Sequence, residues 1–575
     1  MPEIMEKRAD EQPEKIAFRF LSDGTSDQKT DWTYRELATC ARAVSGELNR
    51  AGVDGGRVVL ALDPGLDYVA GLFGILRSGA TAVPSFPPVG RGSLARFRSI
   101  VADCAPDAVL TDARFAPHVA EFEEQLPAGL PRPRWIFPDE DFFHAPSDTP
   151  LRVADPALLQ YSSGSTGDPK GVVLTHANLV SNCEALARHM GADPDRVGCS
   201  WLPPYHDMGL MGTILLAVHG GWPLVMMSPL HFVQHPYRWL KAITDHRVTI
   251  TVGPNFAFDL CASAIDDDEL RTLDLSTLRQ VFCGSEPVSG ATLQQFADRF
   301  GPTCGFDASS VIPCYGLAEA TLFVAGKTLA SGHPRIERLD KRALEQGEAR
   351  HAEAADGGAV ELVSCGAVAD GHEVRVVDPA TGRELPPGRI GELWIGGPNV
   401  AAGYLDRPDA THDTFGARLA DDRPEYLRSG DLGFLFDGEL FVTGRLKDLI
   451  VVGGRNIHPQ DVEESVRRSH PAMRRTAAFS VPAEHGVEEM VVVVAEFRGP
   501  AEEFIREEGE LRDRVTAEIT GEHGVRPAAL HFGPPGTVLM TTSGKVRRAA
   551  TRAAWLAGEL KSFPRPAARP QAPVR

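Results

Sequence analysis

At 575 residues the chain is too long for one ordinary hydrophobic core, so we expect two or more domains. Hydrophobic residues make up 43% of it and charged residues 24%, a composition typical of a soluble globular enzyme. The net charge of -19 argues against a general nucleic-acid binder, because such a protein needs lysine and arginine to neutralise phosphate.

Cysteine usage and the N-terminal sequence narrow the class further. The nine cysteines are scattered singly with no Cys-x-x-Cys pair, which predicts neither a disulfide framework nor a zinc site. Residues 1–10 include acidic side chains and no apolar segment, so they are not typical of a signal peptide. No apolar run reaches the roughly 18 residues that a membrane-spanning helix needs. We therefore expect a cytoplasmic protein.

Residues 1 to about 150 alternate helical and extended patterns. Apolar residues recur at helical spacing over 34–48, and a second helix is predicted at 68–76. Buried strands are predicted at 58–62 and 79–83. Alternation of this kind predicts a layered α/β architecture with parallel strand pairing.

The stretch from Tyr161 to Gly171 has the composition of a phosphate-binding loop. Glycine lets backbone N–H groups turn toward an anion, hydroxyl groups add donors and lysine adds charge. It is not a Walker loop, because no Gly-Lys-Ser/Thr follows at the required spacing. A flexible linker is the alternative, but the stretch lies between the apolar runs 157–159 and 172–174, which favours the phosphate loop. The residues that we assign to phosphate binding are Ser162, Ser163, Gly164, Ser165, Thr166, Gly167 and Lys170.

This stretch resembles the ATP-pyrophosphate loop of the adenylate-forming enzymes, which include acyl-CoA synthetases, luciferases and peptide-synthetase adenylation domains. The resemblance runs along nearly the whole chain. It implies an α/β fold, with a large N-terminal domain of layered sheets and helices and a smaller, mobile α+β C-terminal domain. The expected divisions are an N-terminal domain over 1–443, a hinge over 444–448, a C-terminal lid over 449–561, and a disordered Pro/Arg tail over 562–575.

A histidine beside an aspartate follows in the segment 201–212. Flanked by glycines and large apolar groups, His206 could line a pocket where a carboxylate substrate docks, or serve as a core or capping histidine. The resemblance implies the first role, beside the activated carboxyl group. For Asp207 we favour a cap or turn role.

Apolar segments predict where the rest of the substrate binds. Buried strands are expected at 223–230 and 248–252, and the segment 253–258 follows the second at its C-terminal end, where open α/β sheets bind ligands. It has no ionisable group before Asp259, whereas an amino-acid substrate would need a carboxylate to pair its ammonium. An apolar acyl chain fits better, although core packing is the alternative for some of these side chains. The predicted acyl-pocket residues are Met208, Gly209, Met211, Asn255, Phe256 and Phe258.

Two segments with a strand followed by a turn, 281–287 and 311–320, supply candidates for nucleotide binding. Tyr315 offers a flat face to a purine and Glu319 an oxygen ligand to Mg²⁺, and the resemblance implies both roles. Many members of the family have threonine just before that glutamate. Here it is Ala318, and the sequence Tyr-Gly-Leu-Ala-Glu-Ala-Thr resembles fatty acyl-AMP ligases. The predicted nucleotide-binding residues of both segments are Gly284, Ser285, Glu286, Cys314, Tyr315, Gly316, Leu317 and Ala318.

The region from 321 to 391 is longer than a typical CoA ligase needs. Its charge-mixed part, 334 to about 356, has the composition of a solvated helix and loop. It resembles the insertion of fatty acyl-AMP ligases, here at about 330–360, which implies hindrance of the C-terminal movement that CoA thioesterification needs.

Four charged residues near the C-terminus complete the predicted site. A carboxylate accepts from both ribose hydroxyls and a guanidinium offers a fixed fork, and the resemblance implies these roles for Asp431 and Arg445. It also places Lys447 at the hinge. Lys545, which follows a Ser-Gly turn, resembles the lysine that reaches the carboxylate and the α-phosphate in the adenylating conformation. On composition alone each would be a surface charge.

The sequence thus predicts a fatty acyl-AMP ligase with Lys545, His206 and Glu319 as catalytic residues and Glu319 as the metal ligand. The resemblance implies that it adenylates a medium- or long-chain fatty acid using ATP and Mg²⁺ and then passes the acyl group to the phosphopantetheine arm of an acyl carrier protein. An acyl-CoA synthetase using free CoA is the first alternative. A catalytically silent acyl- or nucleotide-binding relative is the second.

Overall fold

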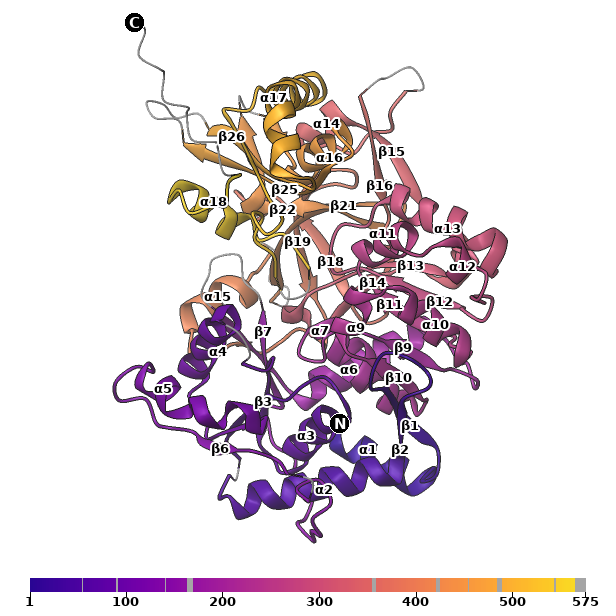
Figure 1. The fold of residues 1–575 in the computed structure, drawn as a ribbon, viewed down its shortest axis with the longest axis vertical. Coiled ribbons are helices and arrows are strands. Elements are labelled where there is room, and N and C mark those ends of the chain that lie inside the picture. The colour runs from indigo at the N-terminus through magenta and orange to yellow at the C-terminus, as the bar shows by residue number, and fades with distance from the viewer. Residues whose placement is uncertain are drawn as a thin grey trace, which may run out of the picture.

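The structure, a computed structural model, describes residues 1–53, 55–88, 91–139, 141–162, 169–353, 358–419, 425–452, 455–482, 489–541 and 544–563. The segments up to residue 445, coloured from indigo through magenta to light orange in Figure 1, form two large sheets with helices packed on them. The last segments, orange to yellow, form a smaller unit with its own sheet at the top of the view. This is the mixed α/β architecture predicted from the sequence.

The first large sheet is parallel in one half and antiparallel in the other. Its parallel half consists, in spatial order, of β13 (Val311–Gly316), β12 (Gln280–Cys283), β11 (Ile250–Gly253), β9 (Gly198–Ser200), β10 (Leu224–Met227) and β1 (Ile16–Leu21), with β2 (Lys29–Thr33) antiparallel at the edge. Its antiparallel half consists of β14 (Phe323–Gly326), β17 (Ala367–Val368), β22 (Glu439–Arg445), β21 (Leu427–Phe436), β19 (Gly391–Gly396) and β18 (Glu373–Val377). The two halves meet at β13, which also carries nucleotide-site candidates.

The second large sheet contains the strands predicted near the N-terminus. Strands β3, β4, β5 and β6 pair in parallel, which confirms the expected parallel pairing. The sheet runs in the order β20 (Gly403–Tyr404), β8 (Lys170–Leu174), β7 (Leu158–Ser162), β4 (Thr81–Pro84), β3 (Arg57–Ala61), β5 (Ala108–Thr111) and β6 (Arg134–Ile136).

Helices with buried apolar side chains cover the sheets. In α2 (Tyr34–Arg50), Thr33 caps the first turn and Glu36 completes a capping box. In α6 (His176–Met190), Thr175 is the predicted N-cap and pairs with Asn178 in the same way. The other longer helices of this part are α1 (Pro2–Glu11), α3 (Leu66–Arg77), α4 (Arg91–Cys104), α10 (Tyr237–Asp245), α11 (Asn255–Ala264) and α13 (Gly290–Cys304), and the shorter ones include α5 (Val119–Glu124), α7 (Asp207–Gly209), η2 (Leu210–Leu215), α8 (Leu216–Gly220), α9 (Pro229–Gln234), α12 (Asp267–Leu270), η4 (Ala318–Ala320) and α15 (Pro408–Phe415).

The C-terminal part has a separate hydrophobic core, in which Phe497, Phe504 and Val515 are buried. Its helices are α16 (Pro459–Ser469), α17 (Ala501–His523) and α18 (Arg548–Leu556), and its strands are β23 (Ile450–Val452), β24 (Arg455–Ile457), β25 (Met473–Pro482), β26 (Glu489–Phe497) and β27 (Ala529–Gly533). Phe563 stacks on Phe504 with ring centres 4.5 Å apart. Packing therefore extends past residue 562, where the sequence predicts the tail to begin, and residues 564–575 lie outside the described chain.

The charge-mixed segment differs from the solvated helix and loop that its composition predicts. Strand β15 (Ile336–Asp340) pairs antiparallel with β16 (Ala359–Val363), and the short helix α14 (Lys341–Glu345) follows β15. Leu339 and Leu344 are buried against Phe434 and Phe441. In strand β15, Leu339 is the one buried side chain and marks the inner face. The charged residues around it hide the alternation of buried and exposed positions that would identify a strand in the sequence.

Among the described residues, no helix is both long enough and apolar enough to cross a membrane.

Candidate active site

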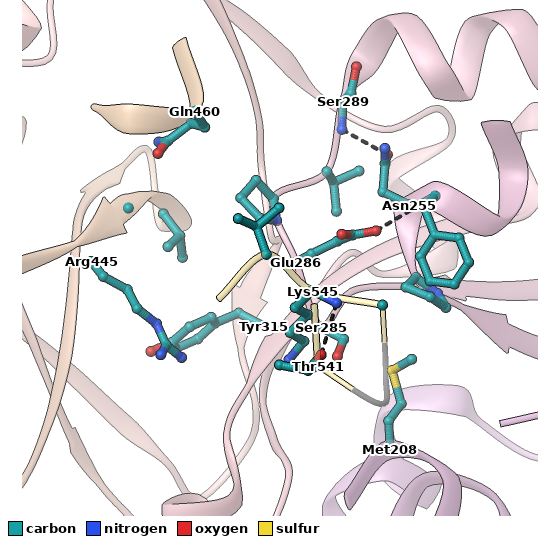
Figure 2. A pocket seen from close by; sticks show the side chains of 18 of the residues that line it. Met208, Asn255, Ser285, Glu286, Ser289, Tyr315, Arg445, Gln460, Thr541 and Lys545 are labelled. Atoms are coloured by element: carbon teal, nitrogen blue, oxygen red, sulfur yellow. Dashed lines mark hydrogen bonds between the residues drawn. The ribbon is translucent and has the colours of Figure 1, made fainter. Parts of the chain in front are cut away.

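A cavity of about 3140 Å³ lies between the N-terminal part and the C-terminal part of the chain. Its lining comes from strand ends of the first sheet, from helix starts beside them, and from the loop before α18. Figure 2 shows Lys545 of that loop close to Ser285 and Glu286, with Tyr315 and Arg445 on the other side. Segments far apart in the sequence therefore share one cavity.

His206 and Asp207 lie at the start of α7, on the wall of this cavity. The Nδ1 atom of His206 is 2.7 Å from Oδ1 of Asp207, and the same oxygen accepts the backbone N–H of Met208 at 2.7 Å. Burial opposes ionisation of Asp207, but His206, Lys545 and the Met208 N–H outweigh it and lower the pKa of this carboxyl to about 2. Asp207 thus has the turn role expected for it and also orients His206.

Lys545 projects into the cavity from a short turn. The backbone N–H of Thr541 donates to the carbonyl of Lys545 at 2.8 Å, and the Lys545 N–H donates to Oγ1 of Thr541 at 2.9 Å. Burial lowers the pKa of the Lys545 ammonium, and Asp207 opposes this shift. Within the described parts of the chain, the ammonium makes no hydrogen bond or ion pair, so it is available to an anion.

Tyr315, Asp431 and Arg445 form a connected group on the opposite wall. The hydroxyl of Tyr315 donates to Asp431 at 2.8 Å, and Nε of Arg445 lies 3.2 Å from the other oxygen of this carboxylate. Asp431 on β21 and Arg445 on β22 are directly paired in the antiparallel ladder, and this pairing holds the two side chains next to each other. Burial raises the pKa of Tyr315 well above its usual value, and the charge of Asp431 adds to this. The tyrosine therefore stays neutral and can present its ring face.

Glu319 lies in the one-turn helix η4, after β13. One of its carboxylate oxygens accepts the hydroxyl of Tyr404 at 3.0 Å. The ammonium of Lys170 lies 4.8 Å from the centre of the Tyr404 ring, so Tyr404 connects the predicted metal ligand to a residue assigned to phosphate binding. Lys170 itself is not part of the cavity lining.

Ser285 and Glu286 follow β12 at its C-terminal end. Ser285 has φ of +74°, a conformation that a non-glycine residue adopts at a cost and that often occurs at functional sites. Glu286 accepts the backbone N–H of Phe256 at 2.7 Å, and burial raises the pKa of its carboxyl. Asn255 accepts the N–H of Ser289 at 3.0 Å. These bonds tie the end of β12 to the start of α11.

Two glycines allow backbone segments to pack closely against each other beside the predicted nucleotide-binding residues. A Cβ atom on Gly316 would lie 1.7 Å from the carbonyl oxygen of Leu322, and one on Gly284 would lie 2.8 Å from Sγ of Cys314. Gly284 does not line the cavity and acts through this close packing, whereas Cys314, Gly316, Leu317 and Ala318 are part of the lining.

The predicted acyl-pocket residues divide into two groups. Met208, Asn255 and Phe256 line the cavity. Met211 and Phe258 are fully buried in the core and Gly209 packs against the carbonyl of Pro203, so their assignment to the pocket is corrected.

Part of the cavity lining, called the apolar branch, consists of large apolar side chains that the sequence did not point to. Trp201 follows β9 and stacks on Phe232 with ring centres 3.8 Å apart. Its position after a strand could have identified it, by the same rule that identified 253–258. The other apolar residues of this branch come from both ends of the strands and from helices beside them, and they include Leu186, Leu216, Trp222, Leu224, Ile250 and Phe282.

The insertion is bonded directly to the C-terminal part. Glu345 accepts from Arg455 at 2.6 Å, and Nζ of Lys341 donates to the carbonyl of Glu522 at 2.7 Å. The same ammonium lies 3.0 Å from Nδ1 of His523, whose pKa burial lowers to about 4. The histidine is therefore neutral at physiological pH and can accept from the lysine.

Some predicted residues cannot be placed in this way. Ser163 to Gly167 lie outside the described residues, and for Ser162 only the backbone, which pairs with Lys170, is described. Lys447 is exposed at the cavity edge in η6 (Leu446–Asp448), and its role as a hinge stays a prediction. No group of three or more metal-ligating side chains occurs among the described residues.

The AMP-binding enzyme family matches residues 5–405. A medium-chain-fatty-acid–[acyl-carrier-protein] ligase, JamA of Moorena producens, is 35% identical over 98% of this chain and 96% of its own length. A putative fatty-acid–CoA ligase, fadD25 of Mycobacterium tuberculosis, is 37% identical over 96% of each chain. A solved structure from a study of fatty acyl-adenylate ligases of E. coli and L. pneumophila is 30% identical, with a TM-score of 0.87 over 97% of this chain and 98% of the other.

Proposed function

The chain belongs to the AMP-binding enzyme family, in its fatty acyl-AMP ligase branch, and from this premise we propose that it activates a fatty acid with ATP and passes the acyl group to an acyl carrier protein. The observation that carries the proposal is the convergence of His206, Lys545 and the Tyr315–Asp431–Arg445 group on one cavity. A module that only binds nucleotide has no need of a free ammonium beside an oriented histidine.

The first step joins two anions, so the site must neutralise charge. A carboxylate oxygen of the fatty acid attacks the α-phosphorus of ATP, the bond to the β-phosphate breaks, and pyrophosphate leaves. Lys545 stabilises the charge on both reactants, and His206, held by Asp207, is positioned beside the fatty acid carboxylate. The low-dielectric surroundings that lower the pKa of Lys545 also strengthen its attraction to these anions.

The nucleotide is held from the other side. We propose that the ring of Tyr315 stacks on adenine and that Asp431 and Arg445 bind the ribose hydroxyls. Because Tyr315 and Arg445 both bond to Asp431, the carboxylate is fixed before the sugar arrives. Asp431 keeps free acceptor capacity, since a carboxylate accepts several hydrogen bonds.

Magnesium would enter with the nucleotide. Mg²⁺ is held in many enzymes by one or two carboxylates together with substrate phosphates. Glu319, whose carboxylate is held by Tyr404, fits this pattern and would be the protein ligand. The metal would neutralise charge on the departing phosphates.

The acyl chain would occupy the apolar branch of the cavity. Met208 and Phe256 lie near its start, and Trp222 and Leu224 lie at the amino ends of the strands, on the far side from the chemistry. The apolar residues named for that branch include no carboxylate that could pair a substrate ammonium, which favours a fatty acid over an amino acid. Of the carboxylates that line the cavity near Phe256, Asp259 is exposed and Glu286 accepts the N–H of Phe256.

For the acyl acceptor, an acyl carrier protein is favoured over free CoA. The insertion is bonded to the C-terminal part through Glu345–Arg455 and Lys341–Glu522, which stabilises the arrangement with Lys545 in the cavity. The JamA relative is named as a ligase of an acyl carrier protein, which favours this acceptor. The name of the fadD25 relative favours CoA as the second candidate.

Two assays test these proposals. Fatty-acid-dependent exchange of pyrophosphate into ATP should occur in the wild type, be lost in Lys545→Ala, and persist in Lys29→Ala, which alters an exposed lysine that does not line the cavity. Separate incubations with ATP and a fatty acid, one with CoA and one with a holo carrier protein, should give mainly the acyl thioester of the carrier protein. Rapid acyl-CoA formation would reject the proposed acceptor, and absence of exchange in the wild type would reject the whole function.

A further inference from the structure

Two arginines face the cavity beside the end of β7, and they come from different parts of the chain. Arg96 lies on α4 and Arg547 lies two residues after Lys545. The guanidinium of Arg96 is 5.5 Å from the centre of the Phe86 ring. Over the described part of the chain, neither guanidinium has a hydrogen-bond or ion-pair partner.

Two carboxylates that lie close to residues of this wall are already paired with other groups. Asp103, which is also on α4, accepts from Arg407 at 2.7 Å and from the hydroxyl of Tyr161 at 2.6 Å. Asp63 is paired with Arg114. The charges of Arg96 and Arg547 are therefore not neutralised by these acids.

The two guanidinium groups act on each other unfavourably. Burial lowers the pKa of Arg96, and the nearby positive charge of Arg547 lowers it further. Two like charges in a partly buried cavity destabilise the arrangement unless an anion lies between them. Arg96 belongs to the N-terminal part and Arg547 to the C-terminal part, so their repulsion opposes the packing of the two parts on each other when no anion is bound.

We propose that Arg96 and Arg547 form a binding site for a phosphate group, and that this group stabilises the C-terminal part in its closed position. Guanidinium forks bind phosphate oxygens in a bidentate manner, which suits a site made of two arginines. The inference rests on the proposed function, which brings two such ligands to the cavity: the pyrophosphate portion of ATP and the phosphate of a phosphopantetheine arm. Gln160 and Tyr161 of β7 line the same wall, directly before the predicted phosphate loop, which favours pyrophosphate.

A binding experiment without turnover tests the site itself. Thermal unfolding is measured against inorganic pyrophosphate for the wild type, Arg96→Gln, Arg547→Gln and the control Arg98→Gln, whose arginine lies on the same helix and bonds to Gln125 instead. Pyrophosphate should stabilise the wild type and the control, and each cavity variant should bind it about tenfold more weakly, as expected for loss of a charge-assisted bond. Equal stabilisation of all four proteins, or none in the wild type, would overturn the proposal.

Two kinetic measurements then identify which phosphate is bound. If it is pyrophosphate, the KM for pyrophosphate in ATP exchange rises about tenfold in both cavity variants, while transfer from preformed acyl-adenylate to a holo carrier protein is unchanged. If it is the phosphopantetheine phosphate, only the transfer step weakens. Arg547→Lys should recover part of either loss, because it restores the charge without the planar fork.

Failure of the inference is distinguishable from failure of the proposed function. If the wild type makes acyl-adenylate but the cavity variants match Arg98→Gln in all assays, the phosphate site is refuted and the function stands. If the wild type makes no acyl-adenylate, the function fails, and pyrophosphate binding still decides whether the arginine pair is a phosphate site.

Discussion

The substitution Asp207→Asn tests whether one carboxylate both orients His206 and tunes Lys545. The carboxylate lies 2.7 Å from Nδ1 of His206 and raises the pKa of Lys545 against the effect of burial. Asparagine keeps the shape and can still accept the N–H of Met208, but it removes the negative charge. The substitution therefore separates charge from geometry.

The magnitude follows from the pKa of the carboxyl. A fall from 3.8 to about 2 corresponds to about 2 kcal/mol of stabilisation of the ionised form in the folded state. Because the folded pKa of Asp207 is depressed, this stabilisation is present above pH 4 and is lost as the pH falls toward 2. Asp207→Asn should lower the free energy of unfolding by up to about 2 kcal/mol at pH 7, and less at pH 3.

The same change should alter the pH dependence of the reaction. Without Asp207 the pKa of Lys545 falls, so the lysine loses its proton at a lower pH and the alkaline limb of the exchange rate shifts downward. The rate at pH 7 should fall about 10- to 100-fold, as for loss of a hydrogen bond to a charged group.

The assays are urea unfolding at several pH values and ATP–pyrophosphate exchange from pH 6 to 10. Asp31→Asn is the matched control, because Asp31 is paired with Arg19 at 2.6 Å and its pKa is also lowered, but it lies outside the cavity. The control should lose stability without a change in the pH profile of exchange. An unshifted alkaline limb in Asp207→Asn would refute the coupling to Lys545.

Three further changes test other parts of the site. Tyr315→Phe removes the bond to Asp431 and should raise the KM for ATP about 5- to 10-fold, with little effect on the KM for fatty acid. A KM for ATP equal to that of the wild type would contradict the nucleotide-binding role. Gly316→Ala would place a Cβ atom 1.7 Å from the carbonyl oxygen of Leu322, so we expect a loss of about 3 kcal/mol or more by urea unfolding; a wild-type midpoint would show that this turn is not as tight as described. Trp222→Ala should lengthen the apolar branch and shift kcat/KM toward longer fatty acids in a graded series; an unchanged preference would place the end of the branch elsewhere.

Local features of the sequence determined much of the fold. The capped start of the helix at Thr175, the apolar spacing of residues 34–48 and the strand–helix alternation before residue 150 all have counterparts in the structure. These features depend on neighbouring residues, through caps and side-chain period, and so are visible in a linear pattern. The charged insertion was predicted less well, because strand β15 has only one buried side chain, Leu339, to mark its inner face.

The tertiary structure alone decided which side chains share the cavity. Met208 and Met211, like Phe256 and Phe258, are equally apolar in the sequence, yet only the first of each pair lines the cavity. Periodicity identifies an apolar face but not whether that face meets the core or a cavity. The facing of Arg96 and Arg547 likewise arises only from the packing of two parts of the chain, since no local pattern joins residues so far apart.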